Sequence, residues 1–306
     1  MASKQRVICG LSVAAVWLLA IFALPIWALA TLVTLSAGIC LFELSAMLKK
    51  AGYILPFGWL SAATVGWFAL QYTVLTSGDT SLAEVKHFAL PVICATLFFR
   101  VLLDARVQKP METACLTVVS FLYIPYMLSF LLPIAMQPVR VFEGVTVTST
   151  YSAGIFLAFM LALVTKMSDT GGYFIGSSFG KHKMCPRLSP GKSWEGTAGG
   201  YGFSLIVAGI IVLLAHVVFP EATCLRFVRE LTASAPQTLW FFLTVIVIVT
   251  TAICGDLLES LFKRQCGVKD SSALFPAMGG FFDTFDSIIF VPAVFLLMTA
   301  LGKLLF

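Results

Sequence analysis

A polar stretch near the C-terminus carries acidic side chains at spacings that suit the binding of a metal ion. On a helix, Asp256, Glu259 and Ser260 lie at i, i+3 and i+4 and therefore share one face. Asp283 and Asp286 are three residues apart, so at the start of a last helix their carboxylates would also share a face. Aspartates from two helix ends would make an oxygen-only site of the type that Mg²⁺ prefers. We therefore predict that Asp256, Asp283 and Asp286 are metal ligands.

Basic side chains lie between these aspartates. Lys263 continues the helical face of Asp256 at i+7, and Arg264, Lys269 and Asp270 follow it. A polyphosphate needs such cations for charge neutralisation. The sequence shows no nucleophile–base pair of the Ser–His or Cys–His kind, and phosphoryl or nucleotidyl transfer needs none, because metal and cations do that work by positioning and charge stabilisation. The stretch therefore predicts chemistry at a phosphate.

The first polar segment along the chain, residues 166–195, combines glycines with basic residues. Small residues let backbone N–H groups approach a phosphate, and Lys or Arg neutralises it, so we predict an anion site. A P-loop is excluded at Gly191-Lys192-Ser193, because that pattern requires glycine where the chain has Pro186 and a preceding strand. We expect His182, on an exposed basic loop, to be a bystander. The candidate substrate-binding residues of this segment are Asp169, Lys181, Lys192, Ser193 and Glu195.

The composition places most of the chain in a membrane. Its 306 residues are 59% hydrophobic and 11% charged, whereas a soluble domain carries roughly 25% charged residues. Residues 166–195 and 256–286 nevertheless hold 15 of the 35 charged side chains. Charges at a membrane boundary are costly and indicate function. The net charge of +5 is modest, so Lys and Arg serve topology and the site, and no nucleic acid partner is expected.

The apolar runs predict an all-α polytopic membrane protein. A span needs about 20 residues, and it must be helical because lipid offers no partner for free backbone groups. We expect residues 1–150 to form N-terminal scaffold helices that face lipid, and residues 151–306 to form the catalytic region. The eight cysteines show no metal-like spacing and are expected to act as small hydrophobes. The nine candidate spans are residues 7–24, 26–47, 54–76, 88–103, 113–135, 151–168, 199–219, 238–256 and 285–305.

The distribution of basic residues predicts a cytoplasmic N-terminus. With that orientation, 15 of the 20 Lys and Arg fall on the inner side. When the eight basic residues of the two polar segments are left out, seven Lys and Arg remain on the inner side and five on the outer side. Both polar segments then face the cytoplasm, and nine spans put the C-terminus outside. We expect an integral protein of the cytoplasmic membrane of a bacterium-like cell, with its active site facing the cytoplasm.

The polar segments together resemble a known enzyme family. Residues 260–286 read S-L-F-K-R-x(4)-K-D-x-S-x(2)-F-P-x-M-G-G-F-x-D-T-F-D, which looks like the signature of the phosphatidate cytidylyltransferases, or CDP-diacylglycerol synthases. The preceding residues 255–259 also resemble this family, as do residues 168–173, 179–181 and 188–196. The similarity covers roughly residues 165–290. The first 150 residues match only in being several apolar spans.

The resemblance implies the reaction of CTP with phosphatidate to give CDP-diacylglycerol and pyrophosphate. It also implies a divalent metal such as Mg²⁺, a site at the cytoplasmic membrane boundary where the lipid substrate is reached, and a homodimer. Family members are thought to hold their metal with the aspartates that match Asp256 and Asp283. Glu259 and Ser260 would join the first polar segment in binding the nucleotide and the lipid phosphate. The implied catalytic residues around the phosphates are Lys263, Arg264, Lys269 and Asp270.

Two positions depart from the family pattern. The family has His where this chain has Met278, and Arg where it has Thr284. Methionine cannot transfer a proton and threonine cannot supply a positive charge. We expect both positions to be dispensable, because the attacking phosphate is already an anion and needs no general base. Substituting Met278→His should then leave turnover within a few-fold of the parent.

Two other functions fit parts of the pattern. One is a CTP-dependent enzyme that acts on an isoprenoid phosphate or a polyprenol, since the sequence does not reveal the lipid tail. The other is a transporter for an anionic lipid or metabolite. A carrier usually places its charges near the bilayer midplane, often in broken helices. Here the charges lie at span ends on one side, which favours the enzyme.

Overall fold

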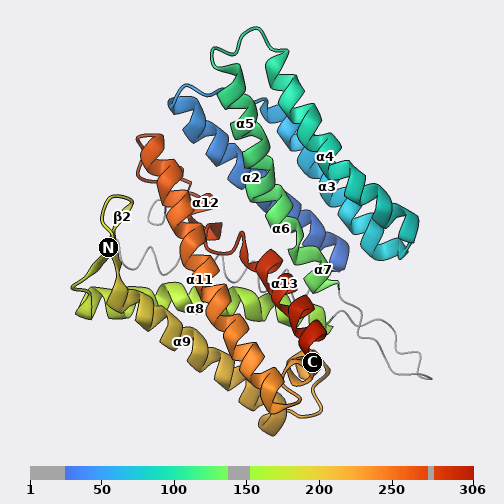
Figure 1. Ribbon diagram of the computed structural model, residues 1–306, viewed down its shortest axis with the longest axis vertical. Coiled ribbons are helices and arrows are strands. Elements are labelled where there is room, and N and C mark those ends of the chain that lie inside the picture. Colours follow the sequence, from blue (N-terminus) through green and yellow to red (C-terminus); the bar gives the residue numbers. More distant parts are fainter. Residues whose placement is uncertain (1–24, 137–151, 275–278) are drawn as a thin grey trace. The chain divides into compact units, whose positions relative to one another are not determined.

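The computed structural model describes residues 25–136, 152–274 and 279–306, which form two compact units (Figure 1). One unit contains the described residues up to Pro133 together with Phe262–Phe285. The other contains the described part of Ile134–Leu261 together with Asp286–Phe306. Helix α11, Ala235–Gln265, contributes its last turn to the first unit and its remainder to the second.

The first unit is a set of antiparallel helices that continue one another through short turns. Helix α2 packs against α3, α3 against α4, and α4 against α5, and the short α12 packs on α2. The largest buried side chains include Trp67, Phe121 and Leu44. The elements are α2 Ile26–Lys50, α3 Phe57–Ser77, α4 Thr80–Leu102, α5 Pro110–Phe121, the π-helical turn η1 Leu122–Tyr126, α6 Met127–Ser129, α7 Leu131–Ala135, of which Ile134 and Ala135 belong to the second unit, and α12 Phe282–Phe285.

Local sequence explains where these helices begin and end. Gly78 ends α3 in the left-handed conformation, with φ 65°, which costs glycine little because it has no Cβ. Asp79 caps the N-terminus of α4 by accepting a hydrogen bond from the Ser81 amide at 2.8 Å. Pro110 begins α5, where a missing N–H costs no helical hydrogen bond. Pro125 lies in the π-helical turn η1, because proline cannot donate the regular helical bond.

The second unit is built on the pair α8 and α9, which lie along each other. Helix α13 and the short segment η3–α10 also pack on α8. A two-stranded antiparallel hairpin joins α8 to α9, with Lys183 paired to Ser193 and Cys185 to Ser189. The elements are α8 Ser152–Phe179, β1 Lys183–Cys185, β2 Ser189–Ser193, α9 Trp194–Leu213, η2 Leu214–Val218, η3 Thr223–Leu225, α10 Arg226–Leu231, α11 to Leu261, and α13 Val291–Leu305.

Glycines of the first polar segment allow α8 and α9 to approach closely. A Cβ on Gly171 would lie 2.6 Å from the Gly199 carbonyl oxygen, and one on Gly200 would lie 2.9 Å from the Ser168 carbonyl oxygen. A Cβ on Gly196 would lie 2.8 Å from the Gly172 oxygen. Small residues serve in this way at membrane helix interfaces. These glycines are therefore packing residues within helices, whereas the sequence suggested that they let backbone N–H groups approach an anion.

Adding one methyl group at this interface should destabilise the second unit. Gly171→Ala would place its Cβ 2.7 Å from that of Phe203, and such overpacking costs about 1–3 kcal/mol. Gly202→Ala is the matched control, because nothing lies within 4 Å of its Cβ position and alanine alone favours a helix by roughly 0.5–1 kcal/mol. Thermal unfolding in detergent should show a lower Tm for Gly171→Ala only. Equal Tm values for Gly171→Ala and Gly202→Ala would contradict the packing role of Gly171.

The helical membrane fold is confirmed for the part of the chain that the structure describes. Six of its helices are long and apolar enough to cross a bilayer: Ile26–Lys50, Thr80–Leu102, Pro110–Ala135, Gly154–Phe179, Trp194–Val218 and Ala235–Gln265. Helix α3, which corresponds to the predicted span 54–76, is not among the six. The predicted span 7–24 lies outside the described residues.

Two predicted boundaries are wrong. The apolar run predicted a span that ends at residue 168, but α8 continues to Phe179, so half of the first polar segment is helical. The last span was predicted as one helix over 285–305. Instead, α12 ends at Phe285, residues 286–290 form a turn, and α13 covers only the 15 residues Val291–Leu305. Asp283 and Asp286 therefore do not share a helix face.

Candidate active site

Three buried or partly buried carboxylates gather in the second unit. Asp256 and Glu259 come from α11, one turn apart, and Asp286 comes from the turn before α13. One carboxylate oxygen from each lies within 4.8 Å of the others. Gly255 permits this approach, because a Cβ there would lie 2.5 Å from the Asp286 carbonyl oxygen. The structure thus joins Asp256 and Asp286, both predicted metal ligands, with Glu259, which the sequence assigned to substrate.

Two lysines compensate the charge of this carboxylate cluster. Lys192 Nζ lies 2.7 Å from Asp256 Oδ2 and 3.5 Å from the Ile253 carbonyl oxygen. Lys166 Nζ donates to Asp169 Oδ2 at 3.1 Å and to Ser287 Oγ at 3.0 Å, and it also interacts electrostatically with the cluster. Lys192 and Asp169 were predicted site residues, and the structure brings both to the cluster. Lys166 is an addition from α8.

The electrostatics of the cluster favour a bound cation. Burial, followed by repulsion from the Asp256 carboxylate, raises the pKa of Asp286 well above its usual range. The Lys166 ammonium opposes this shift but does not cancel it. Ser260 Oγ lies 3.4 Å from Asp256 Oδ1 as a weak donor. Burial disfavours the ionised form of the Asp286 carboxyl group, and a cation bound beside it would stabilise that form.

The hairpin and the start of α9 hold the other predicted residues of the first polar segment. Ser193 is the N-cap of α9, and its Oγ accepts a hydrogen bond from the Gly196 amide at 3.1 Å. Glu195 Oε1 contacts His182 Nδ1 at 2.6 Å, and the Lys181 amide donates to Glu195 Oε2 at 3.2 Å. Glu195 thus closes the hairpin onto the helix, with His182 as its hydrogen-bond partner.

In the first unit, Asp283 organises the loop that carries the C-terminal signature. Its Oδ1 accepts a hydrogen bond from Lys263 Nζ at 2.7 Å. Its Oδ2 accepts bonds from the Ser271 amide and hydroxyl, each at 3.0 Å, and from the Gly280 amide at 2.6 Å. Lys263 and Asp283 are therefore a largely buried ion pair, with 13% and 10% of their side chains exposed.

A second carboxylate, Glu43 of α2, completes this loop. It accepts hydrogen bonds from the hydroxyls of Ser271 at 2.8 Å and Ser272 at 2.6 Å. The amides of Phe281 and Phe282 donate to it at 3.0 and 2.8 Å. Glu43 is buried, with 3% of its surface exposed. We call the group formed by Glu43, Ser271, Ser272 and the amides of residues 281 and 282 the Glu43 cradle.

The glycine pair of the signature is required by the same loop. Gly279 has φ 92°, which side-chain-bearing residues rarely adopt. A Cβ on Gly280 would clash with Ser271 Oγ and Glu43 Oε2. The two glycines thus let the backbone of this loop donate to the carboxylates of Asp283 and Glu43.

The remaining predicted residues lie at the surface of this loop. Arg264 Nη1 donates to the Val268 carbonyl oxygen at 3.4 Å, after the end of α11. Lys269 and Asp270 are exposed. Thr284 Oγ1 is 3.5 Å from the Gly280 carbonyl oxygen. Met278 lies outside the described residues.

Sequence reasoning missed Glu43, Lys166 and the serines of the cradle. A signal existed for two of them. Glu43 and Lys166 are charged residues inside apolar runs, and such residues indicate function by default. Ser271 and Ser272 carry no such signal, because serine is common in turns.

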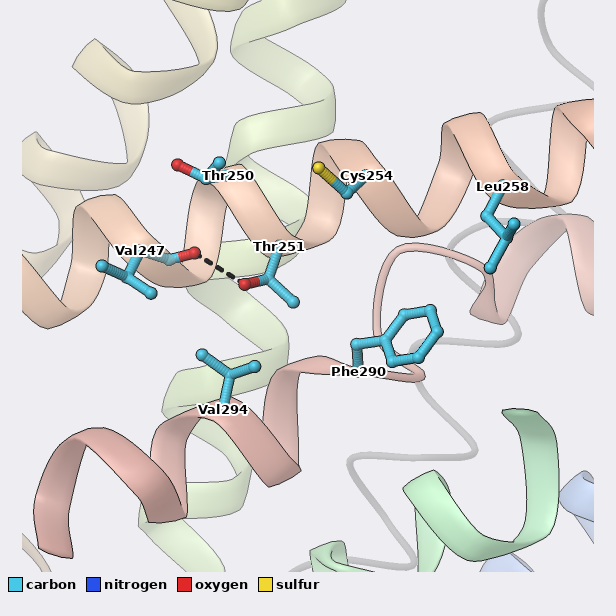
Figure 2. A pocket seen from close by; sticks show the side chains of 7 residues that line it. All are labelled: Val247, Thr250, Thr251, Cys254, Leu258, Phe290 and Val294. Carbon is cyan, nitrogen blue, oxygen red and sulfur yellow. Dashed lines mark hydrogen bonds between the residues drawn. The ribbon is translucent and has the colours of Figure 1, made fainter. Parts of the chain in front are cut away.

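An apolar groove of about 570 Å³ lies beside the carboxylate cluster in the second unit. Figure 2 shows its lining side chains from α11 and from the segment that starts α13. Leu258 lies between two cluster residues in the sequence, and Phe290 belongs to the turn that carries Asp286. Cys254 of α11 and Val294 of α13 also belong to the lining. The groove therefore offers an apolar surface next to a charged site.

Comparison with known proteins agrees with this chemistry. Residues 4–301 match the model of the cytidylyltransferase family. A protein of Haemophilus influenzae named phosphatidate cytidylyltransferase is 28% identical over 285 residues, 93% of this chain and 94% of its own length. Proteins with the same name are 28% identical in Bacillus subtilis, over 94% of both chains, and 31% identical in Mycobacterium leprae, over 88% of this chain and 78% of the relative. With a match along nearly its whole length, the chain belongs to the cytidylyltransferase family.

Proposed function

We propose that this protein is a phosphatidate cytidylyltransferase. A phosphate oxygen of phosphatidate attacks the α-phosphorus of CTP, the bond to the β-phosphate breaks, and CDP-diacylglycerol and pyrophosphate form. Family membership and the names of the relatives support this reaction. The structural observation that carries it is the carboxylate cluster of Asp256, Glu259 and Asp286, with two lysines, beside an apolar groove on membrane helices.

We propose that the carboxylate cluster holds a divalent cation, Mg²⁺ in the first instance. Hard oxygen donors within 4.8 Å of one another suit this ion, and the raised pKa of Asp286 supports the binding of positive charge there. When bound, the cation would supply charge neutralisation for the polyphosphate. Asp283, also predicted as a ligand, would have to exchange a bond to Lys263 for this role.

The basic residues would bind the anionic parts of the substrates. Lys192 is held by Asp256 and can turn to a phosphate that approaches the cluster. Lys263 is kept in position by Asp283, while the exposed Lys269 and Arg264 can reach incoming CTP. The apolar groove would take an acyl chain of phosphatidate. A lipid substrate could then present its phosphate at the cluster while its tails stay in apolar surroundings.

We further propose nine spans with a cytoplasmic N-terminus, a cytoplasmic active site and a homodimer. Helix α11 has 31 residues, or about 46 Å at 1.5 Å per residue, so it exceeds a hydrocarbon core of roughly 30 Å. Its polar end can therefore project into the cytoplasm. The bias of Lys and Arg supports the orientation, and the family resemblance supports the dimer.

The test is an assay of pyrophosphate and CDP-lipid formation by the purified chain in lipid. It would contain CTP, phosphatidate and Mg²⁺, with and without a chelator, and with Asp283→Ala alongside. We expect CDP-lipid and pyrophosphate to form with the parent chain and Mg²⁺, and neither to form with the chelator or with Asp283→Ala. If the chain formed product with an isoprenoid phosphate or a polyprenol and none with phosphatidate, that result would instead support a CTP-dependent enzyme that acts on one of these other lipids. A folded chain that forms no product from any of these lipids would contradict the proposal.

Removing the Lys166 charge should tighten metal binding. This lysine compensates the carboxylate cluster from α8, so a cation must compete with its positive charge. A charge about 4 Å away is worth several kcal/mol at an effective dielectric of about 20. Lys166→Met should therefore bind Mn²⁺ at least about tenfold more tightly. Titration followed by the electron paramagnetic resonance of free Mn²⁺ measures this directly.

The control for this titration is Lys181→Met, which removes an exposed lysine of the same segment. It should bind Mn²⁺ as the parent does. Equal Mn²⁺ affinity in the parent and Lys166→Met would show that Lys166 does not compete with the cation. Absence of Mn²⁺ binding in all three proteins would instead count against the metal site.

A further inference from the structure

The first unit contains a cavity of about 170 Å³ that has polar side chains in its wall and shares no residue with the candidate active site. Gln71 of α3 and Lys86 and His87 of α4 line it, together with Trp67, Tyr126 and Ser129. Trp67 Nε1 donates to Ser129 Oγ at 2.9 Å, and Ser129 Oγ donates to the Tyr126 carbonyl oxygen at 2.7 Å. These two donors of the wall are thus satisfied within the protein.

The side chains of Gln71, Lys86 and His87 are different. Among the residues that the structure describes, Gln71 Oε1 has no hydrogen-bond partner although the side chain is only 2% exposed. Within the same part of the chain, Lys86 has no carboxylate and His87 no hydrogen-bond partner. A buried amide without a partner destabilises the fold. A lysine could reach water by extending its chain, but a side chain as buried as Gln71 cannot.

The position of the cavity points to a lipid. Gln71 is near the end of α3, and Lys86 and His87 are near the start of α4, so the cavity lies toward the turn that joins these helices. Helix α4 is a candidate membrane span, and its next turns expose Phe88 and Val92, at 72% and 59%. Acyl chains can lie along such a face while their headgroup reaches the cavity.

We propose that this cavity binds the headgroup of an anionic phospholipid that carries free hydroxyl groups. The phosphate would pair with the Lys86 ammonium, and a hydroxyl would donate to Gln71 Oε1. Ionisable residues inside membrane segments usually find such partners. The cavity has room for about five water molecules at roughly 30 Å³ each, which suits a glycerol phosphate group. Phosphatidylglycerol is the probe that combines both features.

The experiment compares thermal unfolding of the full chain in nanodiscs of phosphatidylcholine alone and with phosphatidylglycerol. We expect phosphatidylglycerol to raise the Tm of the parent by several degrees. Gln71→Leu should unfold no earlier than the parent in phosphatidylcholine, because it removes a buried unpaired amide, and phosphatidylglycerol should not raise its Tm. Lys86→Met should lose the rise as well. Lys50→Met, which removes an exposed lysine at the end of α2, should keep it.

Several results would overturn the proposal. One is a parent Tm that is the same in both lipids, as expected for a cavity that holds only water. Another is a full rise in both cavity variants. A rise produced by soluble glycerol 3-phosphate in phosphatidylcholine, without one from phosphatidylglycerol, would assign the cavity to a free anion. If Gln71→Leu failed to fold, Lys86→Met would decide between these results.

Discussion

Asp286→Asn is expected to lower CDP-lipid formation by about three orders of magnitude. A bound metal ion supplies several kcal/mol of charge stabilisation, and each step of about 1.4 kcal/mol is tenfold in rate. Asparagine keeps the shape of the side chain but removes the negative charge that completes the cluster with Asp256 and Glu259. The same variant should bind Mn²⁺ much more weakly. Turnover in nanodiscs and Mn²⁺ titration measure the two effects.

The variant should remain folded, which separates this result from loss of structure. Burial raises the pKa of Asp286, so the carboxylate form is disfavoured in the protein without metal. A neutral amide at this place should leave the Tm in chelator unchanged or higher. Glu221→Gln is the control, because Glu221 is exposed and lies outside the cluster. Full activity in Asp286→Asn would contradict its role as a ligand.

Glu43→Gln should have the second largest effect, although Glu43 contacts no predicted catalytic residue. The Glu43 carboxylate accepts four hydrogen bonds from the other groups of the Glu43 cradle, which are two serine hydroxyls and two backbone amides. The glutamine side chain has one acceptor oxygen where the carboxylate has two. Its NH₂ group would therefore lie against hydrogen-bond donors. Bonds to charged groups are worth about 1.5–3 kcal/mol each, so a loss of about 3 kcal/mol is expected. This corresponds to on the order of 100-fold in loop opening and in turnover.

Hydrogen exchange at the amides of Phe281 and Phe282 measures this loss locally. Both amides donate to Glu43 and should exchange faster in the variant, while amides in the middle of α3 keep their protection. Glu84→Gln is the control, because Glu84 is an exposed residue of α4. Unchanged exchange at both amides would show that Glu43 does not hold the loop. Lost turnover with unchanged exchange would indicate a direct role for Glu43 in the reaction.

The glycines show why local pattern can mislead about a role. The sequence contains the same residues whether they surround a phosphate or let two helices approach. Gly171 and Gly200 lie on α8 and α9, where they meet backbone atoms of the opposite helix. Gly280 meets Ser271 and Glu43 instead. Only the packing of distant segments distinguishes these uses.

The sequence by itself determined the membrane class, the place of most helices and the family. Hydropathy and helical spacing are local properties, and the signature residues are contiguous, so both can be read without knowing the fold. The tertiary structure alone decided which side chains meet. Glu43 bonds Ser271 across 228 positions, and Lys166 bonds Ser287 across 121. The periodicity of the sequence cannot predict such pairs, because their members lie far apart along the chain. They form only when folding buries these polar groups together, and each buried group then needs a hydrogen-bond partner.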